Sequence, residues 1–156
     1  MGNRHVSVMI GAPPEVVFGL YTDPGRARDW LSGVREVRTA GPPDQPGSRA
    51  VFVYRWPFKV TAEVLQAEPP NLHVQRVKEL LGLVTCTTTA RFRRVEGGTE
   101  LRVEMDYRVV GGPIGRLFDA RVGDEMVATQ SRDLARLKAL AEEQAGPRRA
   151  HLAGPA

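Results

Sequence analysis

Cysteine is almost absent from this sequence. The one cysteine, Cys86, cannot form a disulfide within the chain, which excludes the class of small secreted domains that internal disulfides hold together. Cys86 lies in the strand-like run VTCTTTARF, with no His or Asp at the spacing of a nucleophilic triad. We therefore expect a small buried apolar group at this position and not a reactive thiol.

Long hydrophobic runs are missing as well. No stretch approaches the roughly 20 apolar residues that a membrane span needs. The start of the chain, MGNRHVSVMIGAPPE, has neither the apolar segment nor the cleavage site of a secretory signal. We expect a cytoplasmic protein without stable membrane insertion.

Histidine is scarce, and motifs that hold cofactors are not found. His5, His73 and His151 are scattered without the spacing of metal ligands. Gly97 and Gly98 indicate a hairpin turn, because a strand pattern follows them where a phosphate-binding loop would need a helix. The sequence therefore predicts neither a metal nor a cofactor.

Charge of one sign is not concentrated anywhere in the sequence. The net charge of +4 is divided between +3 for residues 1–78 (10 basic minus 7 acidic) and +1 for residues 79–156 (12 minus 11). This even spread argues against nucleic acid as a partner. Arg148 and Arg149 lie in GPRRAHLAGPA (146–156), which we interpret as a disordered tail.

The 156 residues, 42% hydrophobic and 26% charged, suit one globular domain over residues 1–145. A strand-like start at 5–10 precedes APPEVVFGLYTDPGRARDW (12–30), which predicts two short helices broken before Pro24. Six strand candidates follow, and a long helix is expected from Pro113 to about Gln144. The strand candidates are 34–40, 48–56, 58–68, 71–79, 83–95 and 99–110.

Short connections make consecutive strands pair antiparallel. The last strand alternates clearly, with apolar residues from Leu101 to Val109 separated by charged ones, so one face of the sheet is dry. That face and the apolar stripe of the long helix must bury each other. We predict an α+β helix-grip fold, in which a curved seven-stranded antiparallel sheet wraps around a long C-terminal helix, with two short helices between strands 1 and 2.

This order of elements, together with APPEVVFGLYTDPGRARDW, VEGGTELRVEMDY and RDLARLKALAEE, resembles the START-like (SRPBCC, Bet v 1-like) superfamily, and within it the bacterial polyketide cyclase/dehydrase and lipid-transport branch. The resemblance implies a deep, largely apolar cavity between the sheet and the long helix. Trp30 would then lie in the lid helices, either as a packing residue or at the rim of a ligand pocket.

Alternation gives candidates for the polar wall of such a cavity. In NLHVQRVKE (71–79), placing Leu72 and Val74 inward puts Arg76 on the same face. An inward arginine is costly unless it is paired or wet, so Arg76 is a candidate for holding an enolate, carboxylate or ketone oxygen. The alternative is that its side chain reaches solvent at the strand end.

The long helix supplies a second set of candidates. Steps of about 100° per residue from Leu134 and Leu137 place four residues on the inner face: Asp119, Gly123, Met126 and Gln130. Gly123 would leave room for a ligand, and Asp119 would bring a carboxylate to a dry wall. The alternative for Asp119 is an exposed side chain or an ion pair with a neighbouring arginine.

The remaining ligand-binding candidates are inward-facing residues of the lid and the strands: Trp30, Phe52, Tyr54, Thr88, Phe92, Met105 and Tyr107. Arg76, Asp119 and Tyr54 are the candidates for catalysis. We predict binding of a small hydrophobic ligand (aromatic, polyketide-like or lipid-like), with polyketide cyclase/dehydrase activity left open. The alternative is a non-catalytic stress-response or regulatory protein that docks a partner through an exposed apolar patch. Monomer and homodimer both stay open.

Overall fold

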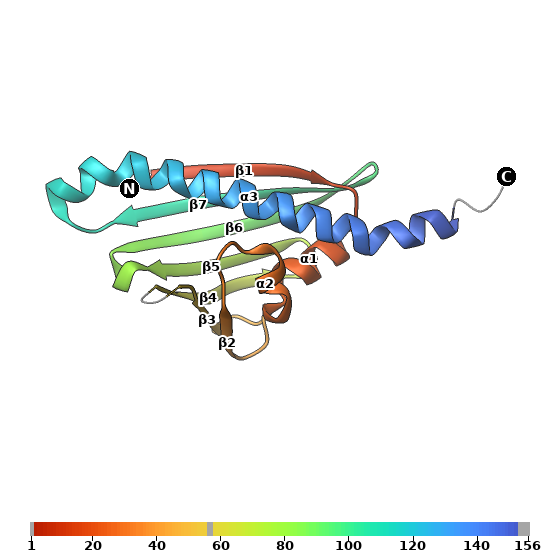
Figure 1. The fold of residues 1–156 in the computed structure, drawn as a ribbon, viewed down its shortest axis with the longest axis horizontal. Helices are drawn as coiled ribbons and strands as arrows, with labels where there is room; N and C mark the ends of the chain where they lie inside the picture. Colours follow the sequence, from red (N-terminus) through yellow and green to blue (C-terminus); the bar gives the residue numbers. More distant parts are fainter. Residues whose placement is uncertain (1, 56–57, 153–156) are drawn as a thin grey trace.

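The computed structural model describes residues 2–55 and 58–152, and Figure 1 shows their arrangement. The elements, in chain order, are β1 (Gly2–Ile10), α1 (Pro14–Thr22), η1 (Pro24–Arg26), α2 (Ala27–Trp30), β2 (Glu36–Ala40), β3 (Arg49–Val53), β4 (Lys59–Glu68), β5 (Leu72–Glu79), η2 (Leu80–Gly82), β6 (Val84–Val95), β7 (Gly98–Val109) and α3 (Gly112–Leu152).

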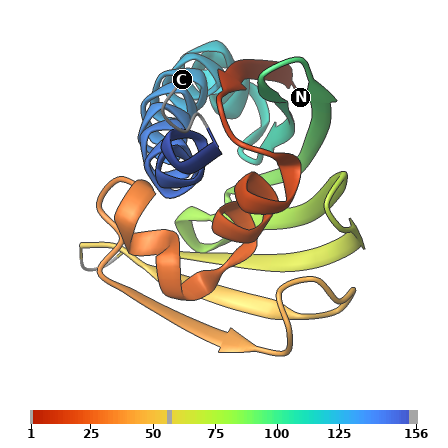
Figure 2. The ribbon, with the colours of Figure 1, turned by 90° about the vertical axis from the view of Figure 1, so that its right-hand side faces the viewer.

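One antiparallel sheet contains all seven strands, in the order β1-β7-β6-β5-β4-β3-β2. Figure 2 shows the sheet curving around α3, with α1 and α2 on the same side of the sheet as α3. The predicted helix-grip architecture is confirmed, including the two short helices between the first and second strands. None of the helices in the described part of the chain is long and apolar enough to cross a membrane.

The two longest strands, β6 and β7, define the inner face of the sheet. In β7 the side chains of Leu101, Val103 and Met105 are buried, and charged residues alternate with them on the outer face. The pairing of Ala90 with Val103 and of Thr88 with Met105 puts the small inner residues of β6 on the same face. The dry face predicted from alternation is confirmed for this strand pair.

The helix α1 begins and ends where the sequence predicts. Pro14 occupies the first turn, where a missing N–H costs nothing. The helix stops before Pro24, because the residue that precedes a proline, Asp23, takes an extended conformation. The Asp23 Oδ1 then accepts a hydrogen bond of 2.8 Å from the Gly25 N–H and so caps the next turn, η1.

The helix α3 is one continuous helix through Gly115 and Gly123, and it extends to Leu152, beyond the end expected near Gln144. It packs mainly against β1, and its side chains Leu134, Leu137 and Ala141 are fully buried. Disorder of residues 146–156 stays a prediction, and residues 153–156 lie outside the described residues.

Gly123 does not lie on the cavity side of α3, where the helical periodicity had predicted it. A Cβ built on it would overlap the hydroxyl of Tyr107, and Arg4 lies close as well. Tyr107 is buried beneath this turn of α3, and its hydroxyl donates a hydrogen bond of 3.0 Å to the backbone carbonyl of Asp119. The small residue therefore lets α3 approach β7 and does not open space for a ligand.

Gly123→Ala tests this close approach. Alanine is favoured over glycine inside a helix by about 1 kcal/mol, but here the added methyl group would force Tyr107 to move, so we expect a net destabilisation of about 1–3 kcal/mol. The matched control is Gly146→Ala in the same helix, where a Cβ meets nothing within 4 Å; it should be neutral or stabilising. Urea unfolding measures both, and equal stabilities for the two variants would contradict the packing described.

Candidate functional site

A cavity of about 400 Å³ lies between α3 and the inner face of β3, β4, β5 and β6, with α1 and α2 closing one side. Much of its wall is apolar, from Leu31, Val60, Val64 and Val77 among others. Exposed residues, among them Asp23, Gly41 and Arg49, form a rim where the cavity meets solvent. The space that the fold was expected to leave is therefore present in the structure.

The strand β5 gives the cavity its length. Four alternate residues of this strand line it: His73, Gln75, Val77 and Glu79. The last residue is six positions after the first, and a strand rises about 3.3 Å per position, so the lined wall extends over about 20 Å. The two ends of this wall are polar and chemically different from each other.

The sequence-based choice of the inner face of β5 was wrong. Arg76 is exposed on the outer face of the sheet, and the alternate positions Leu72 and Val74 lie on the same face, half-buried, and do not line the cavity. The cause is register: Gln75 pairs with Thr88, whose side chain faces inward, and paired residues share a face. The correct alternation of β6 thus contained the signal that would have placed His73, Gln75 and Glu79 inward.

One end of the cavity is aromatic. Trp30 is buried and stacks on Tyr21, with ring centroids 5.4 Å apart and planes at 28°. The ring of His73 meets Tyr21 edge-on at 6.0 Å. Phe92 also packs against Tyr21, at 5.4 Å, but lies below the cavity in the core and does not line it. Trp30 therefore both packs on Tyr21 and lines the cavity.

Two buried nitrogen atoms at this aromatic end have no hydrogen-bond partner among the described residues: Trp30 Nε1 and His73 Nδ1. His73 Nε2 lies 3.2 Å from the carbonyl oxygen of Pro43. A carbonyl only accepts, so Nε2 carries the hydrogen and Nδ1 of the neutral ring is a bare acceptor. Burial lowers the pKa of His73, and the Pro43 hydrogen bond offsets this only in part, which favours that neutral ring.

The opposite end carries a carboxyl group. Glu79 lines the cavity and is half-buried, and this burial raises the pKa of its side chain above the ordinary value. Tyr54 lies near enough for the charge of Glu79 to act on it; burial first, and then that charge, raise the pKa of Tyr54 to about 12. Burial also raises the pKa of Cys86 to about 11, which fits the unreactive thiol expected there.

The helix α3 covers the cavity with one stripe of residues: Val122, Glu125, Met126, Thr129, Gln130 and Asp133. Met126 and Gln130 thus lie where the helical periodicity predicted. The same periodicity misplaced two residues nearer the start of the helix. Gly123 faces Tyr107 of β7, the backbone carbonyl of Asp119 accepts a hydrogen bond from the same tyrosine, and neither residue lines the cavity.

The structure brings seven of the predicted ligand-binding residues to the cavity wall: Trp30, Phe52, Tyr54, Thr88, Met105, Met126 and Gln130. Five lie elsewhere: Arg76, Phe92, Tyr107, Asp119 and Gly123. Of the catalytic candidates only Tyr54 faces the cavity. The role of each wall residue in binding stays a prediction.

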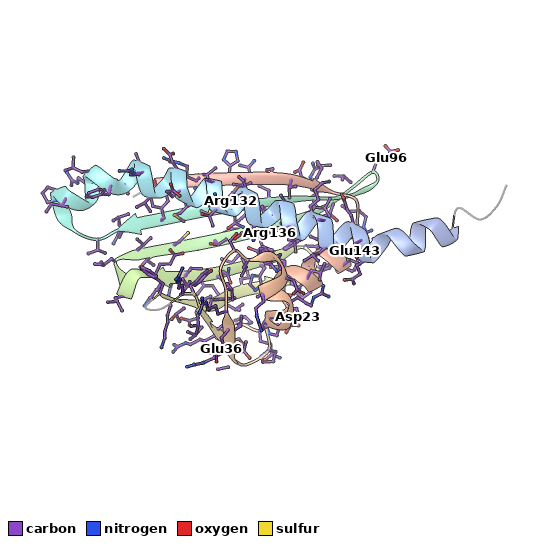
Figure 3. The ribbon with its side chains drawn as sticks, viewed as in Figure 1. Asp23, Glu36, Glu96, Arg132, Arg136 and Glu143 are labelled. Carbon is purple, nitrogen blue, oxygen red and sulfur yellow. The ribbon has the colours of Figure 1, made fainter. Side chains whose placement is uncertain are left out.

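A polar cluster ties the α2 side of the cavity to α3. The buried carboxylate of Asp133 accepts hydrogen bonds from the Ser32 N–H at 3.0 Å and from the Ser32 hydroxyl at 2.5 Å. Arg136 donates to the same hydroxyl oxygen at 3.0 Å. Figure 3 shows Arg136 on the part of α3 that lies over the segment following α2. This cluster fixes the lid helices on α3.

In the part of the chain that the structure describes, no three His, Cys, Asp or Glu side chains come together as metal ligands would.

A family model described as polyketide cyclase / dehydrase and lipid transport matches residues 1–142. The chain belongs to this family. No curated protein matches the sequence. The resemblance stated from the sequence motifs is therefore confirmed at the level of the family.

Solved structures agree on the fold. Protein MLL2253 from Mesorhizobium loti has 20% identity and a TM-score of 0.73, with 91% of this chain and 98% of that chain covered. The di-domain ARO/CYC StfQ from the steffimycin biosynthetic pathway has 15% identity and a TM-score of 0.75, over 92% of this chain and 52% of that chain. DynU16, described as a putative protein in the dynemicin biosynthetic locus, has 21% identity and a TM-score of 0.69, over 92% and 48%.

The two ends of the cavity should respond to pH in opposite ways. The unfolded chain protonates His73 near its ordinary pKa of 6.5, whereas the folded protein resists protonation, so the stability that His73 contributes is present above about pH 6.5 and is lost as the pH falls below it. Glu79 has a raised pKa, so its contribution is present below pH 4.5 and is lost as the pH rises through the native pKa.

Thermal unfolding of His73→Gln and Glu79→Gln across about pH 4 to 8 measures both effects. His73→Gln should lose less stability on acidification than the unaltered protein, and Glu79→Gln should lose less on alkalinisation above pH 4.5. Parallel curves for both variants and the unaltered protein would show that neither group is buried as described.

Proposed function

We propose that this protein binds a small, largely apolar ligand in the cavity under α3. The observation that carries the proposal is the cavity itself: about 400 Å³ falls within the range of small-molecule sites, about 300–1,000 Å³. A space of this size inside a protein is ordinarily filled by side chains, because empty volume lowers the stability of the fold. Membership of a family described by polyketide and lipid chemistry supports the same proposal.

The wall indicates what kind of ligand fits. Apolar side chains make up much of the wall, and polar side chains interrupt it both at its ends and midway, at Gln75, Thr88 and Gln130. At one end the rings of Tyr21 and Trp30 offer a flat aromatic surface. At the other, Glu79 and Tyr54 offer hydrogen-bonding oxygens. An elongated aromatic, polyketide-like or lipid-like molecule with a polar group toward the Glu79 end would satisfy both.

A second candidate function is cyclase/dehydrase activity, and the Glu79 carboxyl favours it. A carboxyl group with a raised pKa exchanges protons readily near neutral pH, so the Glu79 carboxylate can take the α-proton of a β-hydroxy ketone and then return that proton to the departing hydroxyl group, which leaves as water. The Tyr54 hydroxyl nearby would donate a hydrogen bond to the enolate oxygen that forms between these two transfers. StfQ is described as an ARO/CYC protein, which makes the same chemistry worth testing here.

Ligand uptake is tested by filling the cavity from β4. Ala62 is buried and lines the cavity, so Ala62→Phe should displace ligand and weaken binding of anilinonaphthalene sulfonate by about tenfold or more. The matched control is Thr61→Phe, one residue away on the exposed outer face, which should bind the probe as the unaltered protein does. Fluorescence titration measures all three, and equal affinities would contradict a ligand site in this cavity.

Catalysis is tested separately with a β-hydroxy-β-phenyl ketone, whose loss of water gives a conjugated enone that is followed by its absorbance. If Glu79 acts as the acid, Glu79→Gln should lower the rate by about a hundredfold. Glu96→Gln is the control, because Glu96 lies at the far tip of the β6–β7 hairpin (Figure 3) and should not affect the rate. Uptake of the ketone without turnover by the unaltered protein would leave binding as the function and exclude this activity on such ketones.

A further inference from the structure

Exposed apolar side chains are concentrated at one end of the molecule. Among the described residues eight large hydrophobic side chains are exposed, and six of them belong to η2, the turn before β6, the end of β7 and the start of α3. We call this group the end patch; its residues are Leu81, Leu83, Val110, Ile114, Leu117 and Phe118. Figure 1 shows these segments together at the end opposite the C-terminus, where α3 begins.

The backbone gathers the end patch from two separate segments. The Val110 N–H donates a hydrogen bond of 2.8 Å to the Leu83 carbonyl, which joins the β7–α3 connection to the turn before β6. Ile114, Leu117 and Phe118 have the i, i+3, i+4 spacing that puts them on one face of α3. The end patch is therefore one surface and not a set of scattered side chains.

The stability of the fold does not explain why these exposed positions carry apolar residues. Leu117 is 80% exposed, and Leu81 is fully exposed with a φ of +58°, a left-handed conformation that costs an L-residue about 1–2 kcal/mol. A polar residue or glycine in the η2 turn would cost the fold nothing. A contiguous exposed apolar surface of this kind ordinarily marks a contact with another apolar surface.

The charges around the end patch have one sign at the surface. Four exposed cations flank it: Lys78, Arg108, Arg116 and Arg121. Within the described residues none of the four forms a salt bridge. The two carboxylates of the same segments, Glu79 and Asp119, are half-buried, and Glu79 faces the cavity. The partner surface should therefore be apolar and negatively charged.

We propose that the end patch docks this protein peripherally on an anionic lipid surface. The apolar side chains would enter the boundary between headgroups and acyl chains, and the flanking arginines would pair with lipid phosphates and carboxylates. A second copy of the chain fits less well, because a symmetric contact would bring the same cations of both copies together. The proposal concerns a surface outside the cavity, and it does not depend on ligand binding.

The end patch also adjoins the cavity. Leu83 precedes Val84, which lines the cavity, and Phe118 is one turn of α3 before Val122, which lines it too. A lipid surface seated on the end patch would therefore lie next to the Glu79 end of the cavity.

Vesicle flotation tests the proposal with unaltered protein and no added ligand. We expect binding to vesicles of phosphatidylcholine with about one third phosphatidylserine, and much weaker binding to pure phosphatidylcholine. Phe118→Gln should reduce binding to the anionic vesicles by about tenfold. Its control is Met9→Gln, since Met9 is 52% exposed and Phe118 51%, but Met9 pairs with Glu100 near the β6–β7 hairpin, at the other end of the sheet; that control should bind normally.

The charge component is tested with Arg116→Gln and Arg121→Gln, each of which should weaken binding to anionic vesicles by about fivefold. Arg91→Gln, on the outer face of β6, is the control and should have no effect. No flotation with anionic vesicles, or equal losses for Phe118→Gln and Met9→Gln, would overturn the proposal. Light scattering that shows a dimer lost in Phe118→Gln would overturn it as well and assign the end patch to a second copy.

Discussion

The structure depends on a mismatch of widths. Seven strands about 4.8 Å apart make a sheet about 29 Å wide, whereas a helix with its side chains is about 10–12 Å across. α3 packs mainly on β1, at one edge of the strand order. Its side chains cannot also fill the space over the inner face of β3, β4 and β5, and α1 and α2 are too short to fill it. The cavity is the space that stays between this part of the sheet and the three helices that border it.

This uncovered face sets the chemistry of the cavity. Strands paired in register present their inner residues as rows, so β5 supplies a line from His73 to Glu79 beside the smaller Thr88 and Cys86 of β6. A polar group removed from water without a hydrogen-bond partner costs free energy. The neutral imidazole of His73 and the raised pKa of Glu79 are both responses to that cost, because each group takes up its uncharged form more readily.

The fold was predictable from local patterns, and the site only in part. Proline positions fixed α1, and strict alternation fixed β7, because each pattern admits one arrangement. In β5 both faces carry apolar residues, Leu72 and Val74 on one and Val77 on the other, so hydrophobicity alone chose wrongly and only the register with β6 decides. A glycine at position 123 could either leave room for a ligand or allow close packing against the sheet. Only the position of Tyr107 decides between the two, and helical periodicity does not give that position.

The two ends of the cavity are bordered by different interactions. On the α2 side, Ser32 makes two hydrogen bonds with the buried carboxylate of Asp133 and one with Arg136, and the Trp30–Tyr21 stack lies beneath them. Displacing α2 would break all of these together and expose a buried charge. The opposite end is bordered by η2 and the first turns of α3, where large apolar side chains already face water. Contact of those segments with an apolar surface would bury those side chains, so the hydrophobic effect favours contact at this end and offers no such gain at the α2 side.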